Sequence, residues 1–233
     1  MNTFDMGKHA RGSRLSQLGE LLLFLLVIFP VVAAMMVLLR PSELTFTTVA
    51  LHTIVLQSVL LAVAVGLVRW RGEPLAALGL RFGRYWREVQ WGVLLFAPMY
   101  VGAALLEALL REAGLSGLDA PPSFLVPVGP EEMLLALVFL VVVAIAEEVV
   151  FRGYLLLRLR VVLGSPVGAV IVGSIIFALG HGYQGGAGVV TIGAVGAVLA
   201  LVYLWRGSLV APMVMHFLQN FLGIVVMPLA VPS

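Results

Sequence analysis

The chain has 233 residues, of which 61% are hydrophobic and only 11% are charged, against about 25% charged residues in a soluble globular protein. It contains no cysteine, which excludes disulfides, thiolate metal ligands and a cysteine nucleophile. The formal net charge of +2 comes from basic residues in short segments beside apolar runs, which gives no reason to expect a nucleic-acid partner. With a mean hydropathy of +1.10, this composition predicts an all-α polytopic transmembrane helical bundle in a lipid bilayer.

Seven apolar runs follow one another along the chain and predict about seven spans. The first is longer than the apolar region of roughly 7–15 residues in a cleaved signal peptide, so we interpret it as a span. The fifth begins at 161 or 166, and the region around Pro228 leaves room for a short eighth element. The predicted spans are 21–39, 45–68, 91–110, 133–157, 161 or 166–181, 189–205, and 209 to between 222 and 229.

Basic segments alternate along the chain with acidic or neutral ones. The basic segments are the N-terminus, residues 69–90, a short turn at 158–160, and Arg206. Because Lys and Arg accumulate in cytoplasmic loops, we expect the N-terminus in the cytoplasm, as for an integral protein of a bacterial or archaeal plasma membrane. We expect one integrated membrane domain, in which residues 1–130 supply N-terminal helices and an acidic connection, and residues 131–233 supply the core helices.

Two adjacent glutamates, Glu147 and Glu148, interrupt the fourth apolar run. An ionisable group in the membrane costs roughly 2.5–3.5 kcal/mol on insertion scales, so each glutamate needs a compensating partner. Arg152 lies four residues after Glu148 and shares its helix face, which predicts an ion pair. Glu147 lies about 100° away around the helix, so we expect its partners to come from the fifth and seventh predicted helices. We therefore predict a supporting role for Glu148 and a reactive role for Glu147.

Two later apolar runs carry polar residues at helical spacing. Phe177 and His181 share one face of the fifth predicted helix, and His216 and Asn220 share one face of the seventh. Counting about 1.5 Å per residue from the predicted helix ends puts these residues and the glutamates near mid-membrane, with His181 the furthest from the common depth. We therefore expect one polar cavity between the fourth, fifth and seventh predicted helices.

Other polar residues receive structural interpretations. Glu131 and Glu132 follow a Gly-Pro pair at a helix start, where the helix dipole favours acidic residues. His52 and Glu107 lie near span ends, where we expect interfacial or singly hydrogen-bonded side chains. Gln57 lies deeper in the second span and receives no role. The small residues between 164 and 197 predict close helix packing.

A cavity with two carboxylates, two histidines and an amide allows several chemistries. A buried glutamate can act as general base for water, a histidine can share the proton, and N–H groups can hold an oxyanion, which together suit amide hydrolysis. Two histidines and one glutamate could instead bind zinc with an open water position. Intramembrane Glu and His also serve proton-coupled transport, and a structural or binding role needs no chemistry. The residues alone leave these alternatives open.

Three motifs, in this order and on three apolar helices, resemble those of the CPBP family of intramembrane proteases. That family includes the type II CAAX prenyl endopeptidases and bacterial bacteriocin-processing or self-immunity proteins. The motifs are EExxxR at Glu147-Glu148-Val-Val-Phe-Arg152, FxxxH at Phe177-Ala-Leu-Gly-His181, and HxxxN at His216-Phe-Leu-Gln-Asn220. The resemblance covers roughly residues 130–222.

The resemblance implies an intramembrane endopeptidase whose buried site opens toward the cytoplasm. Its substrate would be a peptide or protein, with or without a prenyl group. Glu147 and His181 would activate the water, and His216 and Asn220 would bind and polarise the scissile carbonyl. A non-proteolytic immunity or scaffold protein and a proton-coupled transporter are the alternative functions.

The resemblance also implies supporting residues and a candidate cofactor. Glu148, Arg152 and Phe177 would support the site. The family is classed with metalloproteases, which makes zinc or another divalent metal the candidate cofactor. Its protein ligands would be Glu147, His181 and His216.

Overall fold

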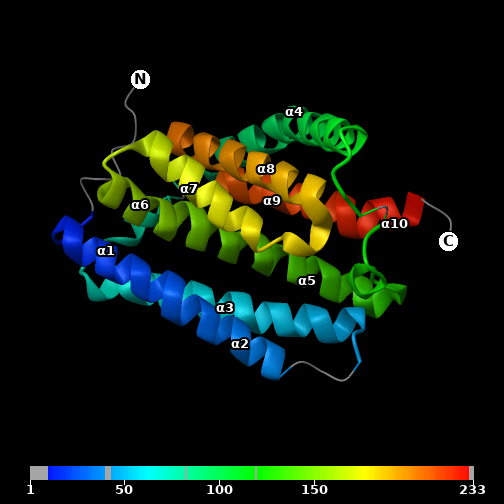
Figure 1. The fold of residues 1–233 in the computed structure, drawn as a ribbon, viewed down its shortest axis with the longest axis horizontal. Coiled ribbons are helices and arrows are strands. Elements are labelled where there is room, and N and C mark those ends of the chain that lie inside the picture. The colour runs from blue at the N-terminus through cyan, green and yellow to red at the C-terminus, as the bar shows by residue number, and fades with distance from the viewer. Residues whose placement is uncertain (1–9, 40–42, 82, 119, 231–233) are drawn as a thin grey trace.

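A computed structural model describes residues 10–39, 43–81, 83–118 and 120–230, and in these residues every regular element is a helix (Figure 1). Six of the helices are long and apolar enough to cross a membrane. A seventh apolar helix, α7 (Pro166–Leu179), has only 14 residues. The predicted helical membrane bundle is thus confirmed, with one of its expected spans shortened.

The N-terminal part supplies three of the six long spans. A π-helical segment, Phe24–Ile28, joins α1 (Arg14–Leu23) to α2 (Phe29–Leu38), so the two form one span. Thr45 and Thr48 cap the start of α3, because each side chain bonds the backbone N–H of the other residue. The remaining elements of this part are α3 (Phe46–Trp70), the 3₁₀ turn η3 (Leu75–Leu78), α4 (Tyr85–Glu112) and the 3₁₀ turn η4 (Ser123–Leu125).

The second half begins with a continuous span of 35 residues, Gly129–Leu163. At its start the Glu132 carboxylate accepts hydrogen bonds from the Val128 N–H and the Thr47 hydroxyl, each 2.8 Å long, which confirms a structural role for this acid. The elements of this half are α5 (Gly129–Glu147), the π-helical η5 (Glu148–Leu155), α6 (Leu156–Leu163), α7, the 3₁₀ turn η6 (Gly182–Gln184), α8 (Gly185–Arg206), α9 (Val210–Phe221), the π-helical η7 (Leu222–Val226) and α10 (Met227–Ala230).

One prediction about a helix end is wrong, and the open question of an eighth element near Pro228 is answered. Residues 158–160 form no turn, because α6 continues to Leu163 and ends at Gly164, whose φ of 65° suits a helix C-terminus. Pro228 does not start a separate element either. It lies in α10, which continues α9 through η7 as the single span Val210–Leu229.

Buried charges hold α1 and the turn after α3 against α6, and explain why the helix continues past residue 158. The Arg158 guanidinium lies 2.8 Å from a carboxylate oxygen of Glu20 and 2.8 Å from one of Glu73. Arg71 also binds Glu20, and the Tyr154 hydroxyl donates to Glu20 over 2.9 Å. Two carboxylates face two guanidiniums, so the group is neutral, as burial of charge requires. We call these five residues the charged cluster.

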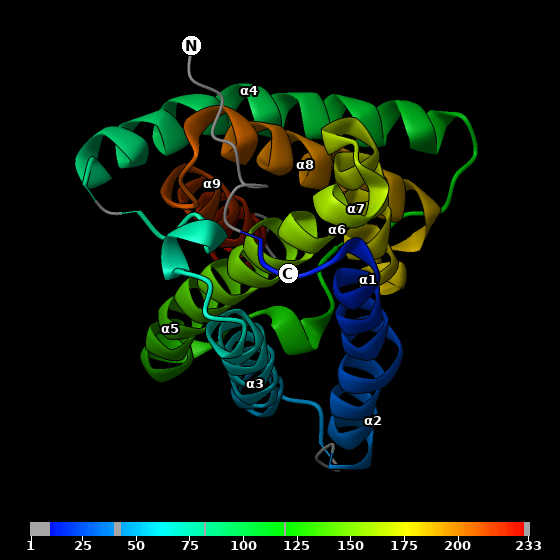
Figure 2. The same cartoon turned by 90° about the vertical axis from the view of Figure 1, so that its left-hand side faces the viewer.

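The helices are arranged around the central span α5–α6. In Figures 1 and 2, α4 lies along one side of the bundle and α1–α3 along the other, with α5 to α9 between them. The charged cluster marks the end of the bundle where α1 begins and α6 ends, at the left of Figure 1. We call it the charged end. The starts of α3 and α5 lie at the opposite end.

Small residues permit close contact between helices, as predicted. A Cβ at Gly92 of α4 would lie 2.6 Å from the Cβ of Val214 on α9. A Cβ at Gly196 of α8 would lie 3.1 Å from a ring carbon of Phe177 on α7. Such contacts leave no room for a larger side chain, so glycine sets the helix spacing here.

Candidate active site

Glu147 is the last residue of α5 and faces a cavity in the middle of the bundle. One carboxylate oxygen, Oε1, accepts a hydrogen bond of 2.7 Å from the Gln57 side chain on α3. The other, Oε2, lies 3.7 Å from Nε2 of His216 on α9 and has no hydrogen-bond partner among the described residues. Glu147 therefore finds one partner on the seventh predicted helix, as expected, whereas its hydrogen bond comes from α3 and not from the fifth predicted helix. One carboxylate oxygen stays available for a ligand.

Glu148 is fully buried, and its partners differ from those of Glu147. Its Oε1 lies 2.9 Å from Nη1 of Arg152, which confirms the predicted pair. The same oxygen lies 2.8 Å from Nδ1 of His216. An ionised carboxylate only accepts, so Nδ1–H of His216 donates to it, and Nε2 is left facing Glu147. Glu148 therefore orients the imidazole that meets its neighbour.

The Phe177 ring contacts the Arg152 guanidinium and both histidines. The Cζ atom of Arg152 lies 4.2 Å from the centroid of the Phe177 ring, which makes a cation–π contact. The same ring centroid lies 4.8 Å from that of His181 and 6.2 Å from that of His216. The aromatic residue of the FxxxH motif therefore packs against all three polar side chains.

The shortness of α7 explains the depth of His181. A helix of 14 residues rises only about 21 Å, roughly two thirds of the bilayer core. The chain turns directly after it, so His181 lies inside the bundle. Nδ1 of His181 lies 3.0 Å from the Phe177 carbonyl oxygen. Because a carbonyl only accepts, Nδ1 carries the hydrogen, and Nε2 makes no hydrogen bond to the described residues.

These helices enclose a cavity of about 390 Å³, which we call the main cavity. Five of the predicted residues line it: Glu147, Phe177, His181, His216 and Asn220. The other two, Glu148 and Arg152, are buried behind it and hold His216 and Phe177. The predicted convergence of three motifs at one depth is therefore present in the structure.

Gln57 is a site residue that reasoning from the sequence missed. Its amide donates to Glu147 from a position 90 residues earlier in the chain. The available signal was a single glutamine deep in an apolar run, since such a residue is costly in a membrane without a polar partner. Helical spacing could not connect it to Glu147, because the two lie on different helices.

The predicted metal ligands do not form a three-ligand site as placed. A catalytic zinc site takes three protein ligands at about 2.0–2.2 Å from the metal. In the part of the chain that the structure describes, no three His, Cys, Asp or Glu side chains are grouped closely enough to hold a metal ion. Glu147 Oε2 and His216 Nε2 lie 3.7 Å apart, and His181 gives its Nδ1–H to a backbone carbonyl, which leaves its Nε2 as the ring atom that could bind a ligand. We therefore derive no step through a metal.

The main cavity extends toward the end opposite the charged end. Its lining includes Val49 and Thr53 near the start of α3, and Phe124 and Leu125 of η4. If basic segments face the cytoplasm, this end faces outward. In this bundle, a cytoplasmic N-terminus is therefore incompatible with a main cavity that opens toward the cytoplasm.

The fold and the cavity define the class of this protein. It is an integral membrane protein with a buried polar site, lined by Glu, His and Asn, of the kind found in enzymes. Residues 129–222 match the family described as type II CAAX prenyl endopeptidase Rce1-like. The match supports the resemblance to CPBP proteases that the motifs predict, and so confirms it over this segment. It runs from the first residue of α5 to the residue after α9, and so includes all three motifs. No curated protein and no solved structure matches the chain.

Proposed function

We propose that this protein is an intramembrane endopeptidase that hydrolyses a peptide bond with water activated by Glu147. The observation that carries the proposal is the main cavity, where Glu147, His181, His216 and Asn220 line one space. The family match supports a protease independently of that geometry. The substrate would be a peptide or protein segment that enters the cavity from the membrane.

The first step needs a base beside a water molecule. Glu147 Oε2 has no hydrogen bond from the described residues, so it can accept a water proton as the water oxygen attacks the carbonyl carbon. His181 would hold the same water through its free Nε2. The tetrahedral intermediate then collapses with cleavage of the C–N bond, and the proton on Glu147 passes to the leaving amine.

The developing oxyanion needs N–H donors. The Asn220 amide supplies one in any protonation state, and it lies one helical turn from His216 on α9. His216 gives its Nδ1–H to Glu148, so its Nε2 can donate only when the ring is an imidazolium.

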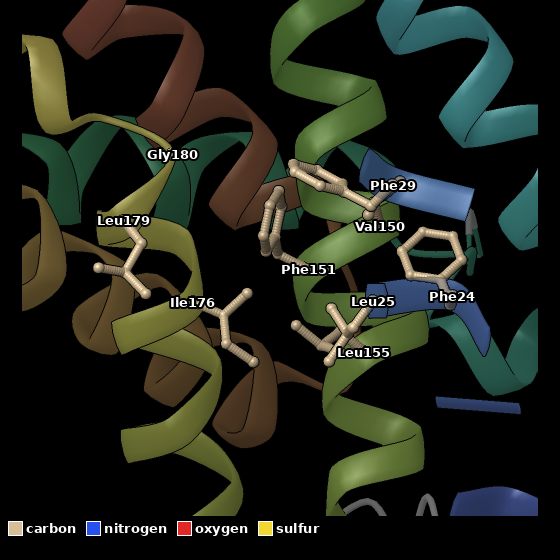
Figure 3. A pocket seen from close by; sticks show the side chains of 9 residues that line it. All are labelled: Phe24, Leu25, Phe29, Val150, Phe151, Leu155, Ile176, Leu179 and Gly180. Atoms are coloured by element: carbon tan, nitrogen blue, oxygen red, sulfur yellow. The ribbon is translucent and has the colours of Figure 1, made fainter. Parts of the chain in front are cut away.

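An apolar cavity beside the main one would suit the lipid chain of a prenylated substrate. It has a volume of about 310 Å³, and side chains from the π-helical segment Phe24–Ile28, α2, η5 and α7 enclose it (Figure 3). Phe29, Phe151 and Gly180 line both cavities, so the two adjoin. A chain that leaves lipid for this cavity gains little hydrophobic energy, because lipid is equally apolar. The cavity would therefore align the peptide more than it adds affinity.

Hydrolysis by the purified full-length protein in lipid nanodiscs tests the proposal. Matched CAAX-type peptides with and without a farnesyl group serve as substrates, and mass spectrometry identifies the products. We expect cleavage by the wild type and loss of at least a hundredfold in kcat for Glu147→Gln. If Glu147→Gln and His181→Ala both cleave at the wild-type rate, the mechanism is wrong.

The alternatives predict different outcomes. An immunity or scaffold protein would keep its cellular phenotype in Glu147→Gln. A transporter would show substrate-dependent proton flux in liposomes. Cleavage of both peptides at equal kcat/KM would support the protease function and contradict a preference for prenylated substrates.

A further inference from the structure

A third cavity, distinct from the main cavity and the apolar one, lies between α4, α8 and α9, and we call it the side cavity. It has a volume of about 160 Å³. Polar residues form more than half of its lining positions: Tyr100, Glu107, Gln184, Thr191 and Gln219, beside Ala103, Ala104, Gly188 and Ile192. Three residues, Gln184, Ile192 and Gln219, line the main cavity as well. The side cavity therefore adjoins the main one from the side of α4.

Two polar atoms at the side cavity lack partners in the protein. The Thr191 hydroxyl oxygen and Gln219 Oε1 are buried and bond to none of the described residues. Thr191 is only 4% exposed. A buried hydroxyl or amide without a hydrogen bond costs roughly 1–3 kcal/mol, so these atoms require a small polar ligand. A hydroxyl that donates and a carbonyl oxygen that accepts suit the same molecule, water.

The size and position of the side cavity fit several water molecules. At about 30 Å³ per molecule in liquid water, 160 Å³ holds roughly five. Glu107 lies at the outer part of the side cavity, where its side chain is 36% exposed and pairs with Arg111 over 3.0 Å. The charged pair can therefore connect the side cavity to the interfacial water near the C-terminal end of α4.

We propose that the side cavity is a water compartment that supplies the hydrolytic water while a peptide fills the main cavity. This rests on the proposed protease function, because only hydrolysis consumes water there. A peptide that occupies the main cavity blocks the direct path of water to Glu147. The side cavity reaches the same space past Gln219, next in sequence to Asn220, and so gives water a separate path.

Thiol labelling tests the compartment without any need for activity, because the chain has no native cysteine. Thr191→Cys places a nearly isosteric thiol in the side cavity. Ser174→Cys is the matched control, since its hydroxyl is also buried and unpartnered among the described residues, but it borders a cavity of only about 10 Å³. Ser174 is 8% exposed, so exposure alone would favour the control. A charged, membrane-impermeant methanethiosulfonate is the probe.

We expect Thr191→Cys to react at least tenfold faster than Ser174→Cys. Ala103→Cys, in the side cavity, should likewise react faster than Leu105→Cys, which is 61% exposed on α4 and faces lipid. Equal rates within either pair overturn the water compartment. This result is independent of peptide cleavage, so it can fail while the protease function stands, and the reverse.

The separate path is tested with a farnesylated peptide whose scissile amide is replaced by a reduced bond. It should protect Thr53→Cys in the main cavity from labelling, and leave Thr191→Cys reactive. Thr191→Val should lower kcat at least threefold with KM within twofold of the wild-type value. Equal protection of both cysteines, or an unchanged kcat, overturns the supply of water through the side cavity.

Discussion

Substitution of each adjacent glutamate by glutamine should affect a different property. At Glu148 it should lower stability, and at Glu147 it should abolish hydrolysis. Glu148→Gln removes the charge from a carboxylate that contacts Arg152 at 2.9 Å and His216 at 2.8 Å, all three buried. Loss of one member of a buried ion pair costs about 3–5 kcal/mol, because the other charge remains without compensation. At about 2–4 °C per kcal/mol for a chain of this size, Tm should fall by roughly 6–20 °C.

Glu147→Gln should leave stability almost unchanged. The glutamine oxygen can still accept the hydrogen bond from Gln57, and the charge that is removed faces the main cavity. We expect a change of about 1 kcal/mol or less. Hydrolysis should nevertheless be lost, because an amide accepts no proton from water at neutral pH.

Thermal unfolding in detergent, followed by tryptophan fluorescence, measures the two Tm values, and peptide hydrolysis measures activity. Glu148→Gln with Arg152→Met removes both charges and should recover at least half of the lost stability. If Glu147→Gln loses as much stability as Glu148→Gln, or if the double variant is no more stable than Glu148→Gln, the assigned division of roles is refuted.

Three further predictions concern the surroundings of the site. Gln57→Leu removes the hydrogen bond that orients Glu147. The value of kcat should fall about tenfold, which corresponds to a loss of about 1.4 kcal/mol, and a Gln57→Asn control should be intermediate. Arg158→Met removes the guanidinium that pairs with Glu73 and leaves Arg71 as the charged partner of Glu20. It should lower stability by about 3–5 kcal/mol, measured as Tm and as yield of folded protein. Chelation followed by dialysis should leave hydrolysis within twofold of its initial rate, because no three-ligand group is present in the described residues; a loss that zinc restores would mean that the site closes around an ion.

Much of the candidate site could be predicted because its members repeat at helical spacing. Glu148 and Arg152, and likewise Phe177 and His181, are four residues apart, so local geometry alone puts each pair on one face. The shared depth of the three motifs follows from the rise per residue. These relations survive errors of several residues in the predicted helix ends, which is why the motifs still converge although most helices begin earlier than predicted.

Contacts between distant segments could not be predicted in the same way. Gln57 reaches Glu147 across 90 residues, and Arg158 reaches Glu20 across 138 residues. From the local sequence, Arg158 is predicted to lie in a basic turn. The carboxylates that compensate its charge come from α1 and from the turn after α3. No local sequence pattern indicates that a carboxylate from a distant segment will pair with Arg158. The end of α6 is therefore predicted too early.

The short helix α7 links the fold to the chemistry. A helix that crossed the whole bilayer core of about 30 Å would need about 20 residues and would carry the residue after it to the interface. At 14 residues, α7 stops inside the bundle, and the turn through η6 brings His181 and Gln184 to the main cavity. An irregular backbone at this depth is tolerated only where it is buried in protein or lines a water-containing cavity. The turn that brings His181 to the main cavity also places Gln184 at the side cavity, where the structure has room for water.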